Sequence, residues 1–286
     1  MLNARIDFNV QDLSVSDIAA VLTRLDPILH SAGSEPALID ASTCQYLGPT
    51  AVVVLASIQL CAVNRNQALD VRLPSSPPPL EAFCRYSGLA QLCSGAPAPD
   101  TMHPANETAA LQRFDRASWG GSTPLVDLVH RHSPNVDEDT VDLLRLCYQE
   151  IAQNIEDHAQ SPIGGLACGR YMSKSSELRI AVADRGLGIA ATLCGAGIEV
   201  RDDVEALELV LRGDISSRPR ANNMGQGISN LAAIAAGNGG RLLIASQGAA
   251  AEVSAKRREG RAKALRHGFP GTLVSLALPL PPHSPS

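Results

Sequence analysis

The chain has 286 residues, 45% of them hydrophobic and only 19% charged, which is enough for about two globular domains with buried cores. A net charge of -5 and a pI near 5.8 argue against nucleic-acid binding driven by phosphate neutralisation. Aromatic residues make up 3% of the chain, which also argues against a stacking platform for single strands.

Cysteine usage and the N-terminus indicate the compartment. The seven cysteines are scattered and include no Cys-x-x-Cys pair, so we expect reduced thiols rather than disulfides or a zinc site. Asp7, Asp12 and Asp17 interrupt the N-terminus early, unlike a secretory signal, and no apolar run approaches the roughly 20 residues of a membrane span. These features predict a soluble cytoplasmic protein.

The first third of the chain, residues 36–93, is expected to alternate short strands with helices. Strands are predicted at Ala37–Asp40 and at Leu69–Leu73, the second from its alternation of apolar and polar residues. Between them, Ala51–Val63 is almost continuously apolar, as a buried helix would be. The small residues and prolines of Ser94–Pro99 then indicate a linker.

A second domain is predicted to begin near Ser122 and to contain a long amphipathic helix. The acidic residues Asp137–Asp139 would favour the positive N-terminal end of this helix, which we expect to run to about His158. Its core-facing stripe is predicted to be Leu144, Tyr148, Ile151 and Ile155.

Four further elements follow this helix. A buried strand is predicted at Ile180–Ala183, an apolar helix at Gly227–Ala236, and closing strands at Leu242–Ile244 and Leu273–Leu278. A basic run lies between the closing strands, and we expect a solvated loop there, with an acidic partner surface as the alternative. It comprises Lys256, Arg257, Arg258, Arg261, Lys263 and Arg266.

Three polar residues of the long helix, Glu150, Asn154 and His158, would share a face beside the core stripe. The amide oxygen of Asn154 suits Mg²⁺, which prefers few protein ligands together with water and phosphate oxygens. Glu150, one turn earlier, could polarise an attacking hydroxyl group or water. The alternative is an ordinary polar shoulder on an amphipathic helix.

Asp184 ends the predicted strand and is followed by a turn that contains Gly186 and Gly188. A buried carboxylate there would accept a hydrogen bond from an exocyclic amino group, and would therefore prefer adenine to guanine. The two glycines would let the backbone approach a flat ring without obstruction by a Cβ atom. A plain turn between strand and loop is the alternative.

The glycines Gly225 and Gly227 open the next predicted helix, where backbone N–H groups and the helix dipole can bind phosphate. The chain contains no Gly-x-x-x-x-Gly-Lys-Ser/Thr sequence, which excludes a P-loop, and it has no Rossmann fingerprint. Glycine pairs are common, so this segment is informative only together with the other two.

In order and spacing, these three segments resemble the N, G1 and G2 boxes of the GHKL-type ATPases (Bergerat fold), which include gyrase, heat-shock chaperones, histidine kinases and mismatch-repair proteins. The segments Asn238–Leu242 and Gly271–Val274 add to the resemblance, because each leads into a closing strand. Glu150, Asn154 and His158 look closest to the helix residues of the anti-sigma-factor serine kinases.

The resemblance implies roles for particular residues. Glu150 would be the general base, Asn154 the Mg²⁺ ligand and Asp184 the adenine reader, with Thr272 supporting the adenine pocket. Residues 190–224 would form a mobile lid, whose candidates for contact with the γ-phosphate are Arg212, Arg218 and Arg220. The remaining nucleotide contacts are expected from His158, Gly186, Gly188, Ile189, Gly225 and Gly227.

The N-terminal region resembles, more loosely, the STAS domain of sulfate transporters and anti-sigma-factor antagonists. The resemblance rests on Ala37–Ser42, Tyr46–Val52 and Leu80–Leu92. Family members in partner switching carry Asp-Ser-Ser-Gly at a helix start, where the second serine takes phosphate, whereas this chain has Gly48–Ala51 in that place. Thr50 keeps a hydroxyl group, but we expect it to cap the helix or to lie in its first turn rather than to accept phosphate.

Together these observations predict a layered α/β protein of two domains. Residues 1–100 would form a STAS-like docking domain, 101–122 a linker, 123–282 a GHKL-type ATP-binding domain and 283–286 a disordered tail. The predicted function is that of an ATP- and Mg²⁺-dependent regulator of the partner-switching type. It would be a serine/threonine protein kinase or slow ATPase acting on a protein partner, such as a sigma-factor antagonist or another STAS domain. The alternative is an ATP-sensing interaction module without chemistry, and a homodimer is expected by analogy alone.

Overall fold

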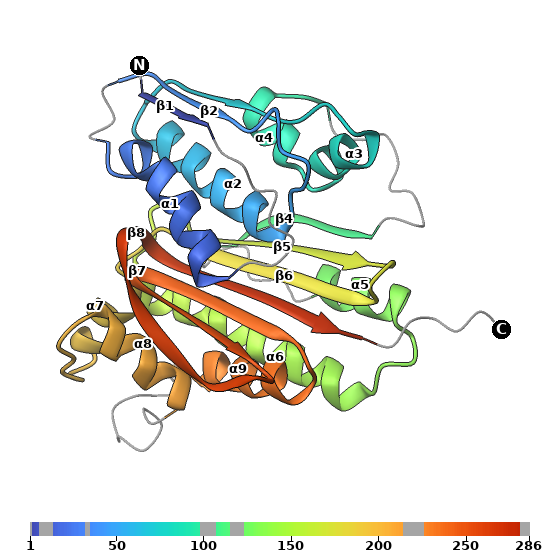
Figure 1. Cartoon of the computed structure of the whole chain (residues 1–286), viewed down its shortest axis with the longest axis vertical. Coiled ribbons are helices and arrows are strands. Elements are labelled where there is room, and N and C mark those ends of the chain that lie inside the picture. The colour runs from blue at the N-terminus through green and yellow to red at the C-terminus, as the bar shows by residue number, and fades with distance from the viewer. Residues whose placement is uncertain are drawn as a thin grey trace.

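Two β-sheets organise the chain, and the predicted mixed α/β class is confirmed. The computed structural model describes residues 2–5, 14–31, 35–97, 107–114, 123–213 and 226–280. In these segments, a parallel sheet, a helical layer, an antiparallel sheet and a second helical layer follow one another across the molecule (Figure 1).

The N-terminal sheet has three parallel strands in the order β1-β2-β3. They are β1 (Leu2–Arg5), β2 (Ala37–Asp40) and β3 (Leu69–Arg72), and the helices of this region are α1 (Val15–Leu29), α2 (Pro49–Asn64), α3 (Pro78–Tyr86) and α4 (Leu89–Ser94). The predicted strands at Ala37–Asp40 and Leu69–Leu73 and the predicted buried helix correspond to β2, β3 and α2, and are confirmed.

The sequence explains the start of α1 and the burial of α2. α1 begins with a capping box, in which the Ser14 side chain accepts from the Asp17 backbone N–H and the Asp17 carboxylate accepts from Ser14. α2 carries apolar residues on all sides, and Val52 to Ala56 are fully buried, as expected for a helix packed between two layers.

The C-terminal sheet is antiparallel, with the strand order β4-β5-β6-β8-β7. Its strands are β4 (Thr108–Phe114), β5 (Gly165–Met172), β6 (Glu177–Asp184), β7 (Arg241–Ser254) and β8 (Arg257–Pro279). Residues 108–114 were expected within the linker, but they pair with β5 because Ala109 and Phe114 are buried against the core. Two other parts of the predicted linker, residues 101–106 and 115–122, lie outside the described residues. The same is true of the tail after Leu280.

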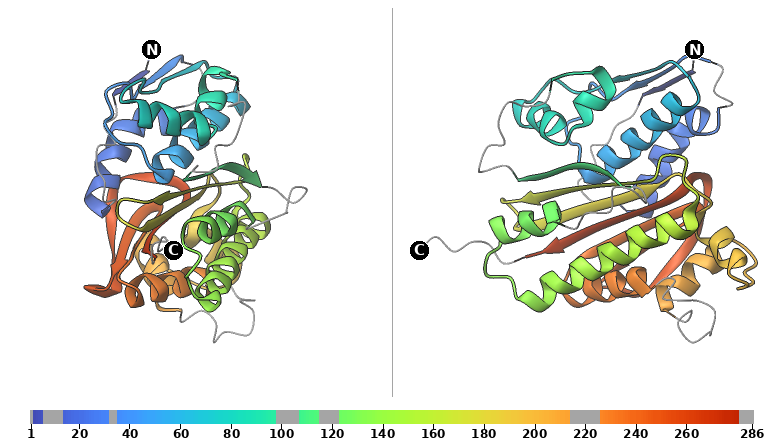
Figure 2. Two further views of the ribbon diagram at one scale, coloured as in Figure 1. Left: turned by 90° about the vertical axis from the view of Figure 1, so that its right-hand side faces the viewer. Right: turned by 180° about the vertical axis from the view of Figure 1, so that it is seen from behind.

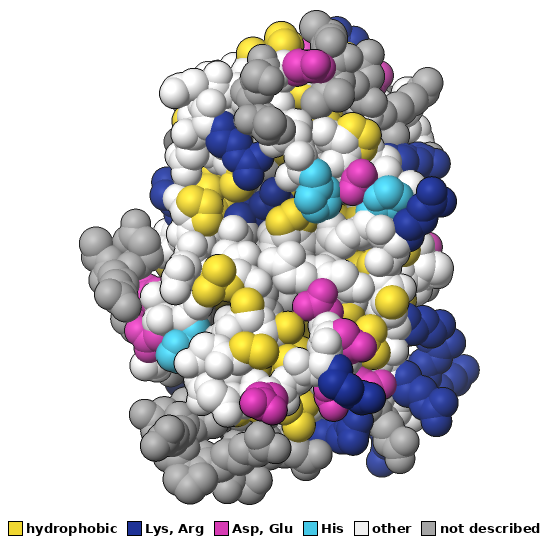
Figure 3. All heavy atoms as spheres, turned by 90° about the vertical axis from the view of Figure 1, so that its left-hand side faces the viewer, with side chains coloured by type: hydrophobic (Ala, Val, Ile, Leu, Met, Phe, Trp, Pro, Cys, Tyr) yellow, Lys and Arg dark blue, Asp and Glu magenta, His cyan; other side chains and the backbone are white. Residues whose placement is uncertain are grey.

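The basic run was expected in a solvated loop, but most of it lies on β8. β7 and β8 form a long hairpin that turns at Ala255 and Lys256. The hairpin extends this far because Ala251 and Val253 are buried, and an added Cβ at Gly260 would lie 3.3 Å from the Leu211 side chain. Its cations are exposed to solvent, and Lys and Arg side chains gather along one side of the face in Figure 3.

One face of the antiparallel sheet is covered by the helices of the C-terminal region (Figure 2). They are α5 (Thr123–His132), α6 (Glu138–Asn154), the π-helix η1 (Ile155–Ala159), α7 (Gly188–Gly195), α8 (Asp203–Arg212) and α9 (Gln226–Gly237). Asp137 caps α6 through the backbone N–H of Thr140, and the predicted core stripe is confirmed, with Leu144, Ile151 and Ile155 buried. None of the helices in the described part of the chain has the length and apolar character needed to cross a bilayer.

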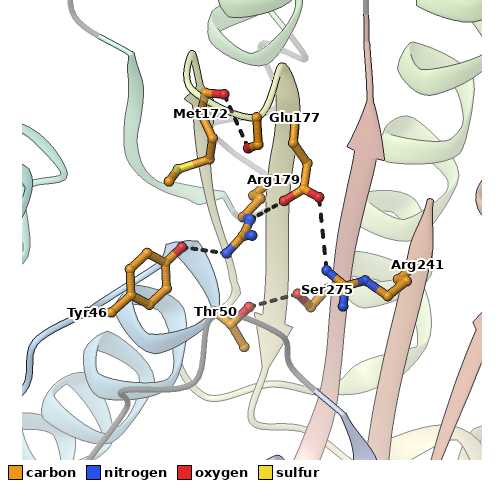
Figure 4. A network of polar contacts seen from close by, with 8 residues as sticks. Tyr46, Thr50, Met172, Glu177, Arg179, Arg241 and Ser275 are labelled. Atoms are coloured by element: carbon orange, nitrogen blue, oxygen red, sulfur yellow. Dashed lines mark hydrogen bonds and ion pairs between the residues drawn. The ribbon is translucent and has the colours of Figure 1, made fainter. Parts of the chain in front are cut away.

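The opposite face of the sheet is covered by α1 and α2 (Figure 1). Thr50, which is 3% exposed, lies in the first turn of α2, and its Oγ1 atom is 2.7 Å from Oγ of Ser275 on β8 (Figure 4). Beside it, Nη1 of Arg179 donates a hydrogen bond of 2.7 Å to the Tyr46 hydroxyl group. The hydroxyl group of Thr50 therefore bonds across the interface and does not cap the helix.

Candidate functional site

A pocket lies between the antiparallel sheet and the helices α6 to α9. Its walls are mainly apolar and include Ile155, Val182, Leu193, Val210 and Ile228. Five of the residues predicted to contact nucleotide line this pocket, and they come from separate parts of the chain: Asn154, Asp184, Gly188, Ile189 and Thr272. An apolar pocket with a few convergent polar groups is typical of a small-molecule site.

Asp184 provides a buried carboxylate at the end of β6, and only 1% of the residue is exposed. The backbone N–H of Gly186 donates to its Oδ1 atom at 2.7 Å, and Thr272 contributes further hydrogen bonds from its backbone and its side chain. Burial raises the pKa of Asp184 to about 6, although these hydrogen bonds and the nearby Arg185 act in the opposite direction. Near neutral pH the group is therefore mainly ionised and can accept from an amino group.

If the pocket binds adenine, as the resemblance implies, the raised pKa of Asp184 gives the affinity for adenosine an expected pH dependence. Adenosine is a suitable probe because it lacks phosphates that would titrate in the same range. A carboxylate that binds an amino group is needed in its ionised form, so affinity should fall as the pH drops through about 6, by up to about tenfold per pH unit. Calorimetric titration across this range measures the effect, and Asp184→Asn should abolish the pH dependence.

Ser246 lies within β7 and links this strand to the first turn of α7. It pairs with Thr272 in the sheet register, its Oγ atom lies 3.3 Å from the Thr272 hydroxyl oxygen, and it accepts a 2.9 Å hydrogen bond from the backbone N–H of Ile189. The neighbouring Gln247 donates from Nε2 to the carbonyl oxygen of Leu187 at 3.0 Å. The sequence analysis missed both residues, because their only signal was that two polar residues follow the apolar run Leu242–Ala245.

The glycines after Asp184 are required by close packing. A Cβ atom on Gly186 would lie 1.9 Å from the carbonyl oxygen of Ala159, so this position admits no side chain. Gly188 has a φ of +79°, and a Cβ atom there would lie 2.5 Å from Cγ of Gln247. Both glycines therefore hold the loop close to its neighbours, whereas the predicted approach to a flat ring stays a prediction.

Glu150 does not line the pocket and instead faces the start of α9. A Cβ atom on Gly227 would lie 2.9 Å from Oε2 of Glu150, so the glycine permits the close approach of α6 and α9. This Oε2 atom is buried and has no hydrogen-bond partner among the described residues. Burial also raises the pKa of Glu150. A buried carboxylate oxygen without a hydrogen-bond partner destabilises the folded state. Its raised pKa makes the group suitable for accepting a proton in catalysis.

The helix stripe predicted from Glu150 to His158 is interrupted. α6 ends at Asn154, which lines the pocket, and the chain continues as the π-helix η1, with one more residue per hydrogen-bonded turn. His158 lies in this π-helix and is not among the residues that line the pocket. Asn154 and Asp184 therefore line the same pocket, whereas His158 does not line it.

Two helices occupy part of the region predicted as a lid. α7 and α8 form most of residues 190–213, and Arg212 forms an ion pair of 2.9 Å with Glu208 one turn earlier. The other two lid arginines, Arg218 and Arg220, and the predicted phosphate-binding Gly225 lie outside the described residues.

The described residues offer few ligands for the Mg²⁺ that the resemblance implies. Among the described residues there is no group of three or more His, Cys, Asp or Glu side chains that could hold a metal ion. Asn154 would thus be a single amide ligand, which fits Mg²⁺ only together with phosphate oxygens and water. This is compatible with the arrangement expected when nucleotide brings the metal.

Comparisons with known proteins do not assign the chain to a family. No protein-family model matches it, and no curated protein matches it. The evidence for a function therefore comes from the pocket and its residues.

Proposed function

We propose that the chain is an ATP- and Mg²⁺-dependent regulatory protein of the partner-switching type, with a GHKL-type nucleotide pocket and a STAS-like N-terminal region. It would act as a serine/threonine protein kinase or slow ATPase on a protein partner. The proposal is supported above all by one observation, that Asn154, Asp184, Gly188, Ile189 and Thr272 line a single pocket. These residues were selected from the sequence as nucleotide contacts, and they lie on α6, β6, α7 and β8.

Three of these residues, together with Gly186 and Glu150, have defined parts in the proposed reaction. The Asp184 carboxylate accepts from the adenine amino group, and Thr272 and Gly186 hold that carboxylate in place. Asn154 orients the phosphate end of ATP, where Mg²⁺, when bound, neutralises charge on the phosphates. Glu150 removes the proton from the attacking hydroxyl group or water.

The position of Thr50 restricts the choice of acceptor. Thr50 is buried under the sheet face opposite to the pocket, with its hydroxyl group on Ser275. A phosphoryl group cannot reach it without separation of α2 from the sheet. The phosphorylated hydroxyl group is therefore expected on another molecule, such as a STAS domain of the sigma-factor-antagonist type.

A second candidate function is an ATP-sensing interaction module without chemistry. One observation favours it, namely that Glu150 packs against Gly227 and does not line the pocket. In this case nucleotide binding would change the surface offered to a partner, and no phosphoryl transfer would follow.

Binding of ATP and GTP by the purified chain tests the proposed function directly. In calorimetry with Mg²⁺ present, ATP is expected to bind at least about tenfold more tightly than GTP, because guanine places a keto oxygen where the Asp184 carboxylate needs a donor. Equal affinities would show that Asp184 does not read the base, and absence of ATP binding would refute the proposal.

A further inference from the structure

Asp184 and Arg185 are neighbours in the chain, but their side chains lie on opposite sides of the antiparallel sheet. Asp184 lines the pocket beside α6 and α7, whereas Arg185 reaches the layer formed by α1 and α2. Such a division follows from the alternation of side chains along a strand. A single peptide unit therefore connects the pocket to the N-terminal layer.

Arg185 is 8% exposed, and its guanidinium group contacts α1 and α2. Its Nη2 atom donates to the carbonyl oxygen of Leu29, the last residue of α1, at 3.5 Å, and its charge interacts with the Cys61 thiol on α2. It also lies 5.5 Å from the ring centre of Phe269. α1 has no basic residue in its own last turn, so Arg185 supplies positive charge at the negative end of this helix.

Besides these favourable contacts, the buried arginine carries a cost for the stability of the fold. Burial lowers the pKa of Arg185 and Arg65 adds repulsion, yet an arginine side chain stays protonated. Its Nη1 atom has no hydrogen-bond partner among the described residues. An apolar side chain of similar size would avoid the cost of burying this charge. If α1 moved away from the sheet, the charge would gain water and lose its contact with Leu29.

The backbone around Asp184 and Arg185 is closely packed. The N–H group of Arg185 donates to Oγ of Ser161 at 3.2 Å. A Cβ atom on Gly271 would lie 2.2 Å from the carbonyl oxygen of Asp184 and 2.7 Å from Cα of Arg185. Because this loop has little free space, a displacement of Arg185 is transmitted to Asp184.

We propose that Arg185 is a positioning residue that couples nucleotide binding in the pocket to the packing of α1 on the sheet. This inference rests on the proposed function, since it assigns a regulatory input to the same site. Coupling between two sites is reciprocal. Nucleotide at Asp184 holds α1 on the sheet more firmly, and a partner that draws α1 away weakens nucleotide binding.

Hydrogen–deuterium exchange of the full chain, with and without ADP and Mg²⁺, tests this coupling. ADP is expected to slow exchange in α1 by about fivefold or more, and Arg185→Met should remove this protection. Arg179→Met is the matched control. Arg179 also bonds across the interface, to Tyr46 (Figure 4). It does not line the pocket and is not next to Asp184 in the chain. This variant should keep the protection.

Calorimetry with ADP on the same samples separates the two proposals. If the parent chain binds no ADP, the proposed function fails and the coupling fails with it. If ADP binds but exchange in α1 does not change, or if Arg185→Met retains the full protection, the coupling alone is overturned. Arg185→Lys keeps the charge and should retain part of the protection, which allows the same comparison if Arg185→Met does not fold.

Discussion

Replacement of Glu150 by glutamine is expected to lower nucleotide turnover by a factor of about 10² to 10⁴, while ATP affinity stays within about twofold of the parent. Glutamine has the size of glutamate, so the contact with Gly227 and the packing of α6 on α9 are retained. The walls of the pocket are unchanged as well, because Glu150 does not line it. The substitution therefore removes the proton acceptor alone. Steady-state turnover and calorimetric titration of one preparation measure the two quantities.

Two further variants complete this experiment. Glu150→Ala removes the whole side chain and should lose turnover to the same extent. Gln153→Ala alters an exposed residue of the same helix and should turn over ATP at the parent rate. Parental turnover by Glu150→Gln would show that Glu150 is not the general base. A parent chain that binds ATP without measurable turnover would favour the ATP-sensing alternative.

The elements that carry the pocket could be predicted because their signals are local. Asp137 and the apolar spacing after it were sufficient for α6, and the apolar run before Asp184 was sufficient for the end of β6. Gly227 was correctly placed at the start of an apolar helix. The candidate residues lie on these elements, and the resemblance to GHKL-type ATPases implied that the Asn154 amide on the helix and the Asp184 carboxylate at the strand end meet one ligand.

The features that could not be predicted depend on contacts between distant segments. Ser246 meets Thr272 only through the register of β7 and β8, which the sequence does not reveal. Residues 108–114 form a β-strand because they pair with β5. The basic run forms part of β8 because the hairpin packs against Leu211 of α8. Likewise, the burial of Thr50 depends on α2 packing on the far face of the sheet.

Replacement of Asp184 by asparagine is expected to weaken ATP binding by about tenfold to a hundredfold. The variant keeps the shape of the side chain and one oxygen that can accept from Gly186. It loses the negative charge that the proposed function places beside the adenine amino group, and it presents an amide N–H₂ group that cannot accept. Calorimetry with ATP and Mg²⁺ measures the loss, and Gln153→Ala again serves as a control with unchanged affinity.

The same substitution should leave the fold at least as stable as the parent near neutral pH. The pKa of Asp184 is raised to about 6 in the folded state, whereas an unfolded aspartate titrates near about 3.9. Below about pH 4 the group is protonated in both states and its ionisation has no effect on stability. Above about pH 6 the folded state must hold the buried charge, which costs about 3 kcal/mol. Asparagine removes this cost, which exceeds the roughly 1 kcal/mol of a Thr272 hydrogen bond that its N–H₂ group cannot accept.

These two effects have opposite signs, and this makes the Asp184→Asn experiment decisive. A variant that unfolds more easily and binds less ATP would indicate general damage to the pocket. A variant with an equal or higher thermal midpoint and much weaker ATP binding can be explained only by the loss of a carboxylate that contacts the ligand. Unchanged ATP affinity in a folded variant would mean that the buried carboxylate serves the loop around Gly186 and does not recognise adenine.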